Sequence, residues 1–317
     1  MSNDELVDIV VYGATSKTGG YVVPYLLKHP EQPSFALAGR SHAKLSALAS
    51  KGVPSTVPLI VADSSDSKAI AAMVKRGRLV LNLAGPFNLF NARGIIEECI
   101  KQGKHYTDIT GESGFYKSVV EQYHDKARKA GVVIAPTTGF DSMPFDLGAY
   151  LAVQHLKSHT PAAKITNVST SFTGIASVSK GTLMSAVDMA SGPNKWQMKS
   201  IEADAFSPID AKHKMPWGPT PMRAPGFGGY MAFTPFSPHN HRIVNRTFGL
   251  LQAEGSQKEK LGELFQYADG MVVGSGDWIG ALFITVFVKM FSTMLIYFPP
   301  ARSAIRALPD GWAMDSG

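Results

Sequence analysis

The feature that most constrains this chain is a short apolar run that leads directly into a glycine-rich turn near the N-terminus. Residues 7–12 read VDIVVY, as expected for a strand covered on both faces of a sheet. Residues 13–20 follow as GATSKTGG, and a helical pattern begins within them. A strand, a glycine-rich turn and a helix in this order form the head of a βαβ unit, whose turn binds the pyrophosphate of a dinucleotide.

Two glycines of this turn match the dinucleotide-binding fingerprint. Gly13 fits the tight turn, and Gly19 fits the position where the helix packs closely on the strand. Ser16 replaces the central glycine, so its hydroxyl either bonds a phosphate or keeps the ligand slightly farther away. Amides at the helix N-terminus complete an anion site. The alternative is a turn that binds nothing. The residues predicted to bind the cofactor here are Gly13, Ala14, Thr15, Ser16, Lys17, Thr18 and Gly19.

The end of the second predicted strand distinguishes the two nicotinamide cofactors. An NAD site places Asp or Glu about 20 residues after the turn, where it accepts from the ribose 2′-hydroxyl. Here that position is Gly39, followed by Arg40 and Ser41, with Lys44 one helical turn later. A guanidinium can bind a 2′-phosphate through two N–H groups. The sequence therefore favours NADP(H). The alternative is a surface arginine that begins a helix capped by Ser41.

Two further strand ends are predicted to line the same crevice. Asp63 closes the third strand, near where the adenine ring would lie, although a helix-capping role fits it equally well. Ala84, Gly85 and Pro86 close the fourth strand, and their small size lets the backbone approach the central ribose and phosphates of the cofactor.

The first half of the chain alternates between short β-branched runs and helical patterns, which predicts a doubly wound parallel sheet. Four glycines that follow helical patterns are expected to be left-handed: Gly52, Gly77, Gly103 and Gly131. Strands are predicted at 7–12, 35–39, 59–63, 79–84, 104–109 and 132–136, and helices at 17–28, 41–51, 65–76, 91–102 and 112–130. The expected fold class is α/β, with a Rossmann domain over 1–140 and a second α+β domain over 141–317.

The second half follows a different pattern. Residues 145–156 are predicted to be helical, and residues 164–174 alternate like a half-exposed strand. Residues 205–240 are rich in Pro, Gly, Met and aromatic side chains, and we interpret them as an elaborate loop region with short strands that covers the substrate.

Residues 278–297, WIGALFITVFVKMFSTMLIY, are the most apolar stretch, with Lys289 near the middle. Their length allows a membrane span. A charge in the middle of a span is costly, and a helix that lies on a lipid surface avoids most of that cost. The third possibility is a buried helix or one at a subunit contact, as in a homodimer.

Composition excludes some partners. The chain of 317 residues has a formal net charge of +6, which suits an anionic cofactor or an anionic lipid surface. It lacks a dense basic block or interleaved aromatics, so nucleic-acid binding is not expected. Cys99 is the only cysteine and no signal peptide precedes the first strand, so we expect an intracellular protein, cytoplasmic or on a membrane or lipid-droplet surface. His239 and His241, two residues apart, are too little for a metal site, so no metal is expected.

Several motifs in order resemble the saccharopine dehydrogenase-like oxidoreductases, in particular the branch that holds mammalian saccharopine dehydrogenase-like proteins and mycobacterial trans-acting enoyl reductases. These motifs are GATSKTG, AGR, NLAGPF, GKHYTDITGE, APTTGFDSMPFDLG, SVSKGTLMS and MAFTPFSPHNHRIVNRT. The resemblance implies a Rossmann domain, a second α+β domain, and association with lipid metabolism, membranes or lipid droplets. It does not imply lysine metabolism. Members of the family usually run about a hundred residues further, so the sequence resembles a shortened form.

The catalytic group is not predicted. No tyrosine has a lysine four residues later, which argues against the Tyr-x-x-x-Lys mechanism of short-chain reductases. Candidates at strand ends are Tyr106, Asp108, Glu112, Asp141 and Ser142, with loop or helix capping as the alternative for the last four. In the second domain, candidates for substrate contact are Lys180, Gly181, Thr182, His241 and Arg242; His239 and His241 would share one side of a strand.

The leading hypothesis is an NADP(H)-dependent reductase of a lipid-like or acyl substrate. The alternative is a membrane- or lipid-droplet-associated protein that binds the nucleotide without turnover, which would explain why no acid–base set is evident. A lysine-pathway dehydrogenase is disfavoured, because no cluster of Arg and Lys suits an amino acid with several carboxylates.

Overall fold

The computed structural model describes residues 6–174, 178–191, 206–208, 221–224, 226, 228–254, 266–272, 277–309 and 313–314. The chain forms two compact units, residues 1–139 and 140–317. The first unit ends at Gly139, beside the boundary expected at residue 140.

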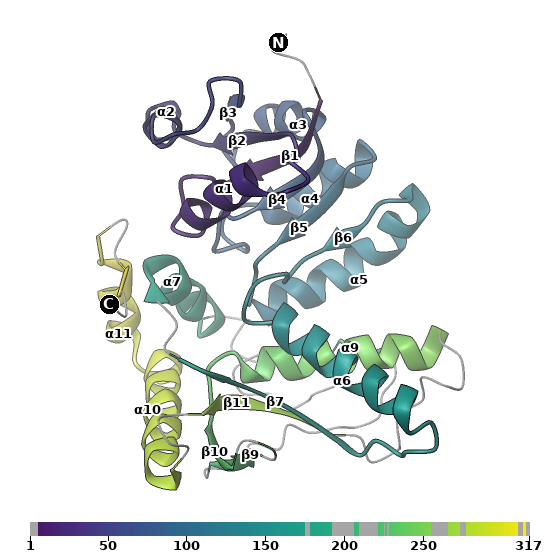
Figure 1. The fold of residues 1–317 in the computed structure, drawn as a ribbon. Helices are drawn as coiled ribbons and strands as arrows, with labels where there is room; N and C mark the ends of the chain where they lie inside the picture. The colour runs from purple at the N-terminus through teal and green to yellow at the C-terminus, as the bar shows by residue number, and fades with distance from the viewer. Residues whose placement is uncertain are drawn as a thin grey trace. The chain divides into compact units, whose positions relative to one another are not determined.

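A six-stranded parallel sheet forms the first unit, with the strand order β3-β2-β1-β4-β5-β6 (Figure 1). Its strands are β1 (Val7–Tyr12), β2 (Phe35–Gly39), β3 (Leu59–Val61), β4 (Gly77–Asn82), β5 (His105–Asp108) and β6 (Ile134–Ala135). The order reverses between β1 and β4, which both pair in parallel. In such folds the ligand crevice lies at this switch point, beyond the carboxyl ends of the strands.

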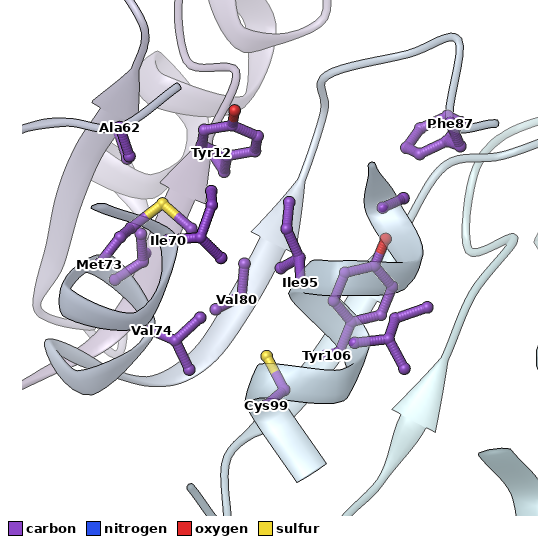
Figure 2. Close-up of a cluster of buried hydrophobic side chains, with 14 of the residues drawn as sticks. Tyr12, Ala62, Ile70, Met73, Val74, Val80, Phe87, Ile95, Cys99 and Tyr106 are labelled. Atoms are coloured by element: carbon purple, nitrogen blue, oxygen red, sulfur yellow. The ribbon is translucent and has the colours of Figure 1, made fainter. Parts of the chain in front are cut away.

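Helices cover both faces of this sheet because successive residues of a strand point to opposite sides. Val10 of β1 packs in one cluster with side chains from three helices, such as Met73, Ile95 and Phe115. Figure 2 shows Met73 and Ile95 in this cluster. Val11 packs in the other cluster, with side chains of two further helices. The helices are α1 (Gly19–Lys28), α2 (His42–Ala49), α3 (Ser67–Lys75), α4 (Ala92–Lys101) and α5 (Ser113–Ala130). The predicted doubly wound sheet is therefore confirmed.

Cys99, on α4, lies inside the first of these clusters with its sulfur among apolar side chains (Figure 2). It is a free cysteine, and burial raises the pKa of its thiol to about 12.

Several local expectations for this unit are wrong. β3 ends at Val61 and β4 at Asn82, each two residues before the strand end expected at Asp63 or Ala84. The first helix begins at Gly19 and not at residue 17, because Ser16, Lys17 and Thr18 still belong to the turn. Gly77 does not end a helix in the left-handed region but begins β4, where it pairs with Val7. A Cβ there would lie 2.8 Å from a methyl carbon of Val10, so close packing explains this glycine. The other three glycines have the expected positive φ: Gly52 (96°), Gly103 (65°) and Gly131 (67°).

The second unit is built around a four-stranded mixed sheet, which fits the predicted α+β class. The strand order is β7-β11-β10-β9, with β7 and β11 parallel and the other pairs antiparallel. Phe145 and Val153 of α6 pack with Val244 and Phe248 of α9 in the core of this unit. The elements are α6 (Met143–His159), β7 (Asn167–Thr173), β9 (Met222–Ala224), β10 (Gly229–Ala232), α9 (Ser237–Glu254) and β11 (Gln266–Val272).

The predicted helix at 145–156 and strand at 164–174 are confirmed as α6 and β7. The region 205–240, predicted as a loop with short strands, lies partly outside the described residues. Its described part holds the hairpin of β9 and β10, and from Ser237 onward it is already helical in α9. The role of this region as a substrate cover stays a prediction.

The apolar segment 278–297 forms one helix, α10 (Trp278–Tyr297). Leu295 of α10 packs in a small cluster with Val187 of α7 (Lys180–Met189) and Ile305 of α11 (Pro299–Arg306). β8 (Val178–Ser179), just before α7, pairs antiparallel with β12 (Ala313–Met314). Toward its N-terminus, α10 contacts β10.

Candidate functional site

The glycine turn and the loop after β4 touch each other at the switch point of the sheet. Gly13 has φ +79°, a conformation that favours glycine. A Cβ at Gly13 would lie 2.7 Å from the backbone nitrogen of Ala84 and 2.9 Å from the carbonyl carbon of Leu83. The Leu83 N–H also donates to the carbonyl of Tyr12 at 2.7 Å. The structure thus brings together two of the segments that the sequence assigned to the cofactor.

The second glycine of the fingerprint, Gly19, is fixed by equally close backbone packing. A Cβ there would lie 2.1 Å from the carbonyl oxygen of Ala14, so no side chain fits at the start of α1. The Gly19 N–H donates to the hydroxyl oxygen of Ser16 at 3.1 Å. Because a hydroxyl can accept and donate at once, Ser16 can stabilise the turn and still offer its proton to a phosphate. A turn in which Gly13 and Gly19 leave no room for a Cβ fits the pyrophosphate site of a dinucleotide.

Arg40 directly follows β2 and is exposed. Ser41 caps α2, where its hydroxyl accepts from the Lys44 N–H at 3.3 Å. The capping alternative thus holds for Ser41, and a role of Arg40 or Ser41 at the 2′-phosphate stays a prediction. The positive charge of Arg40 also contributes, as the smallest cause, to the lowered pKa of the nearby Asp63.

Asp63 is exposed two residues after β3, and its carboxylate accepts from the backbone N–H and the hydroxyl of Ser65 at 2.9 and 2.6 Å. These hydrogen bonds are the main cause of its lowered pKa. The cap of α3 is Asp66, which accepts from the backbone of Lys68 and Ala69. The helix-capping role considered for Asp63 therefore belongs to Asp66, and the position of Asp63 beside the adenine ring stays a prediction.

A chain of buried polar side chains supports the start of the loop after β4. The Asn82 side-chain oxygen accepts from the Ala84 N–H at 2.9 Å, and its amide nitrogen donates to the Tyr106 hydroxyl at 3.1 Å. That hydroxyl donates to Asp108 Oδ2 at 2.7 Å. All three side chains are fully buried. They link the ends of β4 and β5 below the segment that Ala84 begins.

Asp108 also holds the backbone that leaves β6. Its Oδ1 accepts from the N–H groups of Thr110 and Thr137 at 3.0 and 2.8 Å. Thr137 has φ +62°, a strained conformation for a β-branched residue, and this hydrogen bond helps to hold it. Burial raises the pKa of the Asp108 carboxyl to about 6, against the opposite effect of its hydrogen bonds. In the described residues the Asp108 carboxylate accepts hydrogen bonds from Tyr106, Thr110 and Thr137. These contacts favour the loop-capping alternative over a catalytic role.

Glu112 binds the other end of the same loop. Its two carboxylate oxygens accept from the N–H groups of Phe87 and Asn88 at 2.9 and 3.0 Å. The side chain is fully buried. It lies at the N-cap position of α5 but makes no side-chain cap hydrogen bond there. The expected capping role therefore takes a different form, because the carboxylate binds a loop 24 residues earlier in the chain.

The remaining candidates belong to the second unit. Burial raises the pKa of Asp141 to about 6, and its predicted nicotinamide-side role stays a prediction. Ser142 occupies the N-cap position of α6 without a side-chain cap hydrogen bond. Lys180 begins α7, and its ammonium donates to the carbonyl of Leu308, so it connects α7 to the residues that follow α11. In the same helix Gly181 is followed by Thr182, whose N–H donates to Ser179.

The histidines expected on a strand lie on a helix. His239 and His241 belong to α9, so the strand placement is wrong; the missed signal is Pro238 after Ser237, since proline is favoured in the first turn of a helix. His241 Nε2 lies 3.5 Å from Asp269 Oδ1, and both residues are buried. Burial lowers the pKa of His239 to about 3. Arg242 is also fully buried.

These contacts make α9 and β11 the polar core of the second unit, and a substrate contact for His241 or Arg242 stays a prediction. Within the described residues, no three His, Cys, Asp or Glu side chains are placed to hold a metal ion.

Two residues that matter here were not singled out from the sequence. Asn82 ends an apolar strand, where a buried amide signals a hydrogen-bonding role. Asp269 lies in β11, fully buried, and its Oδ2 accepts from the Asn240 side chain at 2.6 Å. Its partners come from distant parts of the chain, so no local pattern could have shown them.

Residues 9–135 match the family model of the saccharopine dehydrogenase NADP binding domain. This range includes the Gly13 turn, Arg40, the loop after β4 and Glu112. The first unit is a saccharopine dehydrogenase NADP binding domain. The resemblance seen in the motifs and the preference for NADP(H) are confirmed at the level of this domain.

Two relatives match different lengths of the chain. A lipid droplet localized protein of Caenorhabditis elegans is 37% identical over 150 residues, covering 44% of this chain and 35% of that protein. A Mycobacterium tuberculosis protein, provisionally named as a trans-acting enoyl reductase, is 32% identical over 285 residues, covering 84% of this chain and 65% of that protein. The matched part of the chain thus spans less than two thirds of either relative.

Among solved structures, apo saccharopine dehydrogenase (L-Glu forming) of Saccharomyces cerevisiae matches 55% of this chain and 35% of its own, at 16% identity and a TM-score of 0.43.

The close approach at Gly13 gives a direct prediction. We expect Gly13→Ala to lower the stability of the NADP binding domain by about 1–3 kcal/mol, because alanine is strained at this φ, and to weaken NADPH binding because Ala84 must move. Gly20→Ala is the matched control, since a Cβ there meets nothing within 4 Å. Thermal unfolding and calorimetric titration measure the two effects. Equal behaviour of the two variants would contradict the assigned contact.

Proposed function

We propose that the chain is an NADP(H)-dependent reductase acting on an apolar, acyl or lipid-like substrate. The observation that carries the proposal is the contact between the Gly13 turn and Ala84 at the switch point of an NADP binding domain. Bound NADPH would supply a hydride to the substrate, and a proton would complete the reduction. The chain itself binds and orients the dinucleotide through residues 13–19, Arg40, Ser41, Asp63 and residues 84–86.

Arg40 is the residue proposed to select NADPH over NADH. It is exposed at the carboxyl end of β2, where an NAD site would place a carboxylate. The carboxylate of Asp63 is near enough for the charge of Arg40 to affect its pKa. A bound 2′-phosphate would therefore compete with Asp63 for the guanidinium.

We expect Arg40→Ala to weaken NADPH binding by about 1.5–3 kcal/mol, the range for a hydrogen bond to a charged group, while NADH binding barely changes. Arg78→Ala is the matched control, because it removes the same charge from an exposed arginine of the same domain. Arg78 Nε lies 3.8 Å from Asp8 Oδ1. Calorimetric titration with both cofactors gives the answer. Equal losses for NADPH and NADH would assign Arg40 a structural role.

An apolar substrate is supported by an aromatic cluster in the second unit. The ring of Phe140 is half exposed and lies 5.6–6.4 Å from the rings of Phe145, Phe172 and Phe236. Such edge-on contacts stabilise an aromatic surface that can receive an acyl chain. The reductase name of the M. tuberculosis relative is consistent with an acyl substrate.

The decisive experiment is turnover. Purified protein is mixed with NADPH and a panel of 2-enoyl and 3-keto acyl thioesters, and the loss of NADPH absorbance is followed. We expect oxidation with at least one substrate, with the Gly13→Ala variant as the baseline. Tight NADPH binding without oxidation would instead support the second candidate, a nucleotide-binding protein at a lipid surface without turnover.

We also propose that α10 attaches the protein to a lipid surface. Ile279, Phe283, Phe287 and Met290 are each more than half exposed, and they are spaced by three or four residues, so they share one face of the helix. Within the described residues α10 is the one helix long and apolar enough to cross a membrane, with a mean hydropathy of 2.1. The C. elegans relative is named for its lipid-droplet location.

The contacts on the opposite side of α10 favour a helix that lies on the lipid surface over one that crosses the membrane. Thr285 is buried and accepts from the Phe233 N–H at 3.0 Å, which joins the helix to the end of β10. Lys289 lies with its ammonium 5.3 Å from the centre of the Phe233 ring. Partial burial there lowers its pKa. The charge therefore lies away from the exposed apolar face, and that face can enter the acyl boundary without it.

We expect the wild type to float with liposomes of phosphatidylcholine and phosphatidylserine, and to stay bound at high salt because apolar burial dominates. Phe283→Asp with Phe287→Asp should lower the bound fraction about tenfold. The matched control is Leu147→Asp with Leu151→Asp, which adds the same charges to exposed leucines of α6. Wild-type protein that stays in solution would mean that another protein surface covers α10.

A further inference from the structure

Two buried carboxylates lie directly below the loop that the proposed function assigns to the cofactor. We propose that Glu112 and Asp108 are positioning residues for the dinucleotide, which fix the backbone of residues 82–88 before the cofactor arrives. The inference rests on the proposed binding of NADP(H) at this loop. It assigns both residues a role through the backbone and not through contact with the substrate.

The loop is held on both sides of its central residues. At its start, the Ala84 N–H is bound by Asn82, whose side chain is held in turn through Tyr106 by Asp108. At its end, the Phe87 and Asn88 N–H groups are bound by the two oxygens of Glu112. Gly85 and Pro86, which are predicted to line the cofactor, lie between these fixed points.

Further contacts keep the end of the loop in place. The Arg93 guanidinium donates to the Asn88 side-chain oxygen at 3.0 Å and to the Ser118 hydroxyl at 2.7 Å. It also lies over the ring of Phe115 at 5.1 Å. Asn88 is thus bound through its backbone by Glu112 and through its side chain by Arg93, so α4 and α5 both hold the loop.

Burying the carboxylates of Asp108 and Glu112 costs free energy of folding, so stability by itself does not explain their location. A fully buried carboxylate loses its hydration, which costs free energy unless hydrogen bonds compensate for it. Here the compensation comes from backbone N–H groups of the loop itself. A loop fixed in advance binds its ligand more tightly because less conformational freedom is lost on binding. Since Gly13 contacts Ala84, the same support also holds the pyrophosphate turn.

Glu112→Gln tests the proposal with little change in volume. Its amide nitrogen would face one of the two N–H donors, so one hydrogen bond is replaced by a repulsive contact. We expect the Phe87 and Asn88 amides to lose protection against hydrogen exchange without ligand, and the Kd for NADPH to rise about tenfold. The rise in Kd is the result that separates the positioning role from a purely structural one, because a purely structural role predicts lost protection with an unchanged Kd.

Glu97→Gln is the matched control, because Glu97 accepts from the Tyr123 hydroxyl at 2.7 Å, which joins α4 and α5 away from the loop. Tyr106→Phe is the second variant and removes only the hydroxyl between Asn82 and Asp108; we expect about a threefold rise in Kd. If Glu112→Gln loses amide protection but keeps its NADPH affinity, or if Glu97→Gln weakens NADPH equally, the positioning role is overturned. If the wild type binds no NADPH, the proposed function itself fails.

Discussion

The close backbone contact between Gly13 and Ala84 is the constraint on which the rest of the NADP binding domain depends. It is possible only because Gly13 has no Cβ and adopts a positive φ. The contact sets how closely the loop after β4 approaches the turn after β1 at the switch point of the sheet. The sheet order and the helices on both faces hold β1 and β4 side by side, so the whole domain helps to keep this contact in place.

The sequence was sufficient for the fold of this domain because each element satisfies a local rule. An apolar run predicts a covered strand, and a glycine after a helix predicts a left-handed end. The rule failed at Gly77, where packing against Val10 and not a turn requires glycine. The polar support under the loop was not predictable in detail. Asn82 and Glu112 bind backbone N–H groups that lie 2 and 25 residues away, and Tyr106 binds the Asn82 side chain, 24 residues away.

The second unit shows the same limit more strongly. Periodicity predicted α6 and β7, because each has its own pattern of buried residues. It failed for His239 and His241, which lie on a helix and not on a strand. The environment of His241 is set by Asp269 and Tyr267, on a strand later in the chain. For α10 the sequence predicts a helix that is apolar on all of its faces. Only the fold distinguishes the face that packs through Thr285 from the exposed face around Phe283.

The buried position of Cys99 has a practical consequence for labelling chemistry. A thiol whose pKa is raised to about 12 is almost entirely protonated at neutral pH, and the thiolate is the form that reacts with maleimides and disulfides. Because it is the only cysteine in the sequence, the folded chain is effectively free of reactive thiols. A cysteine introduced at any exposed position would therefore carry a single probe, and the native residue could stay in its core.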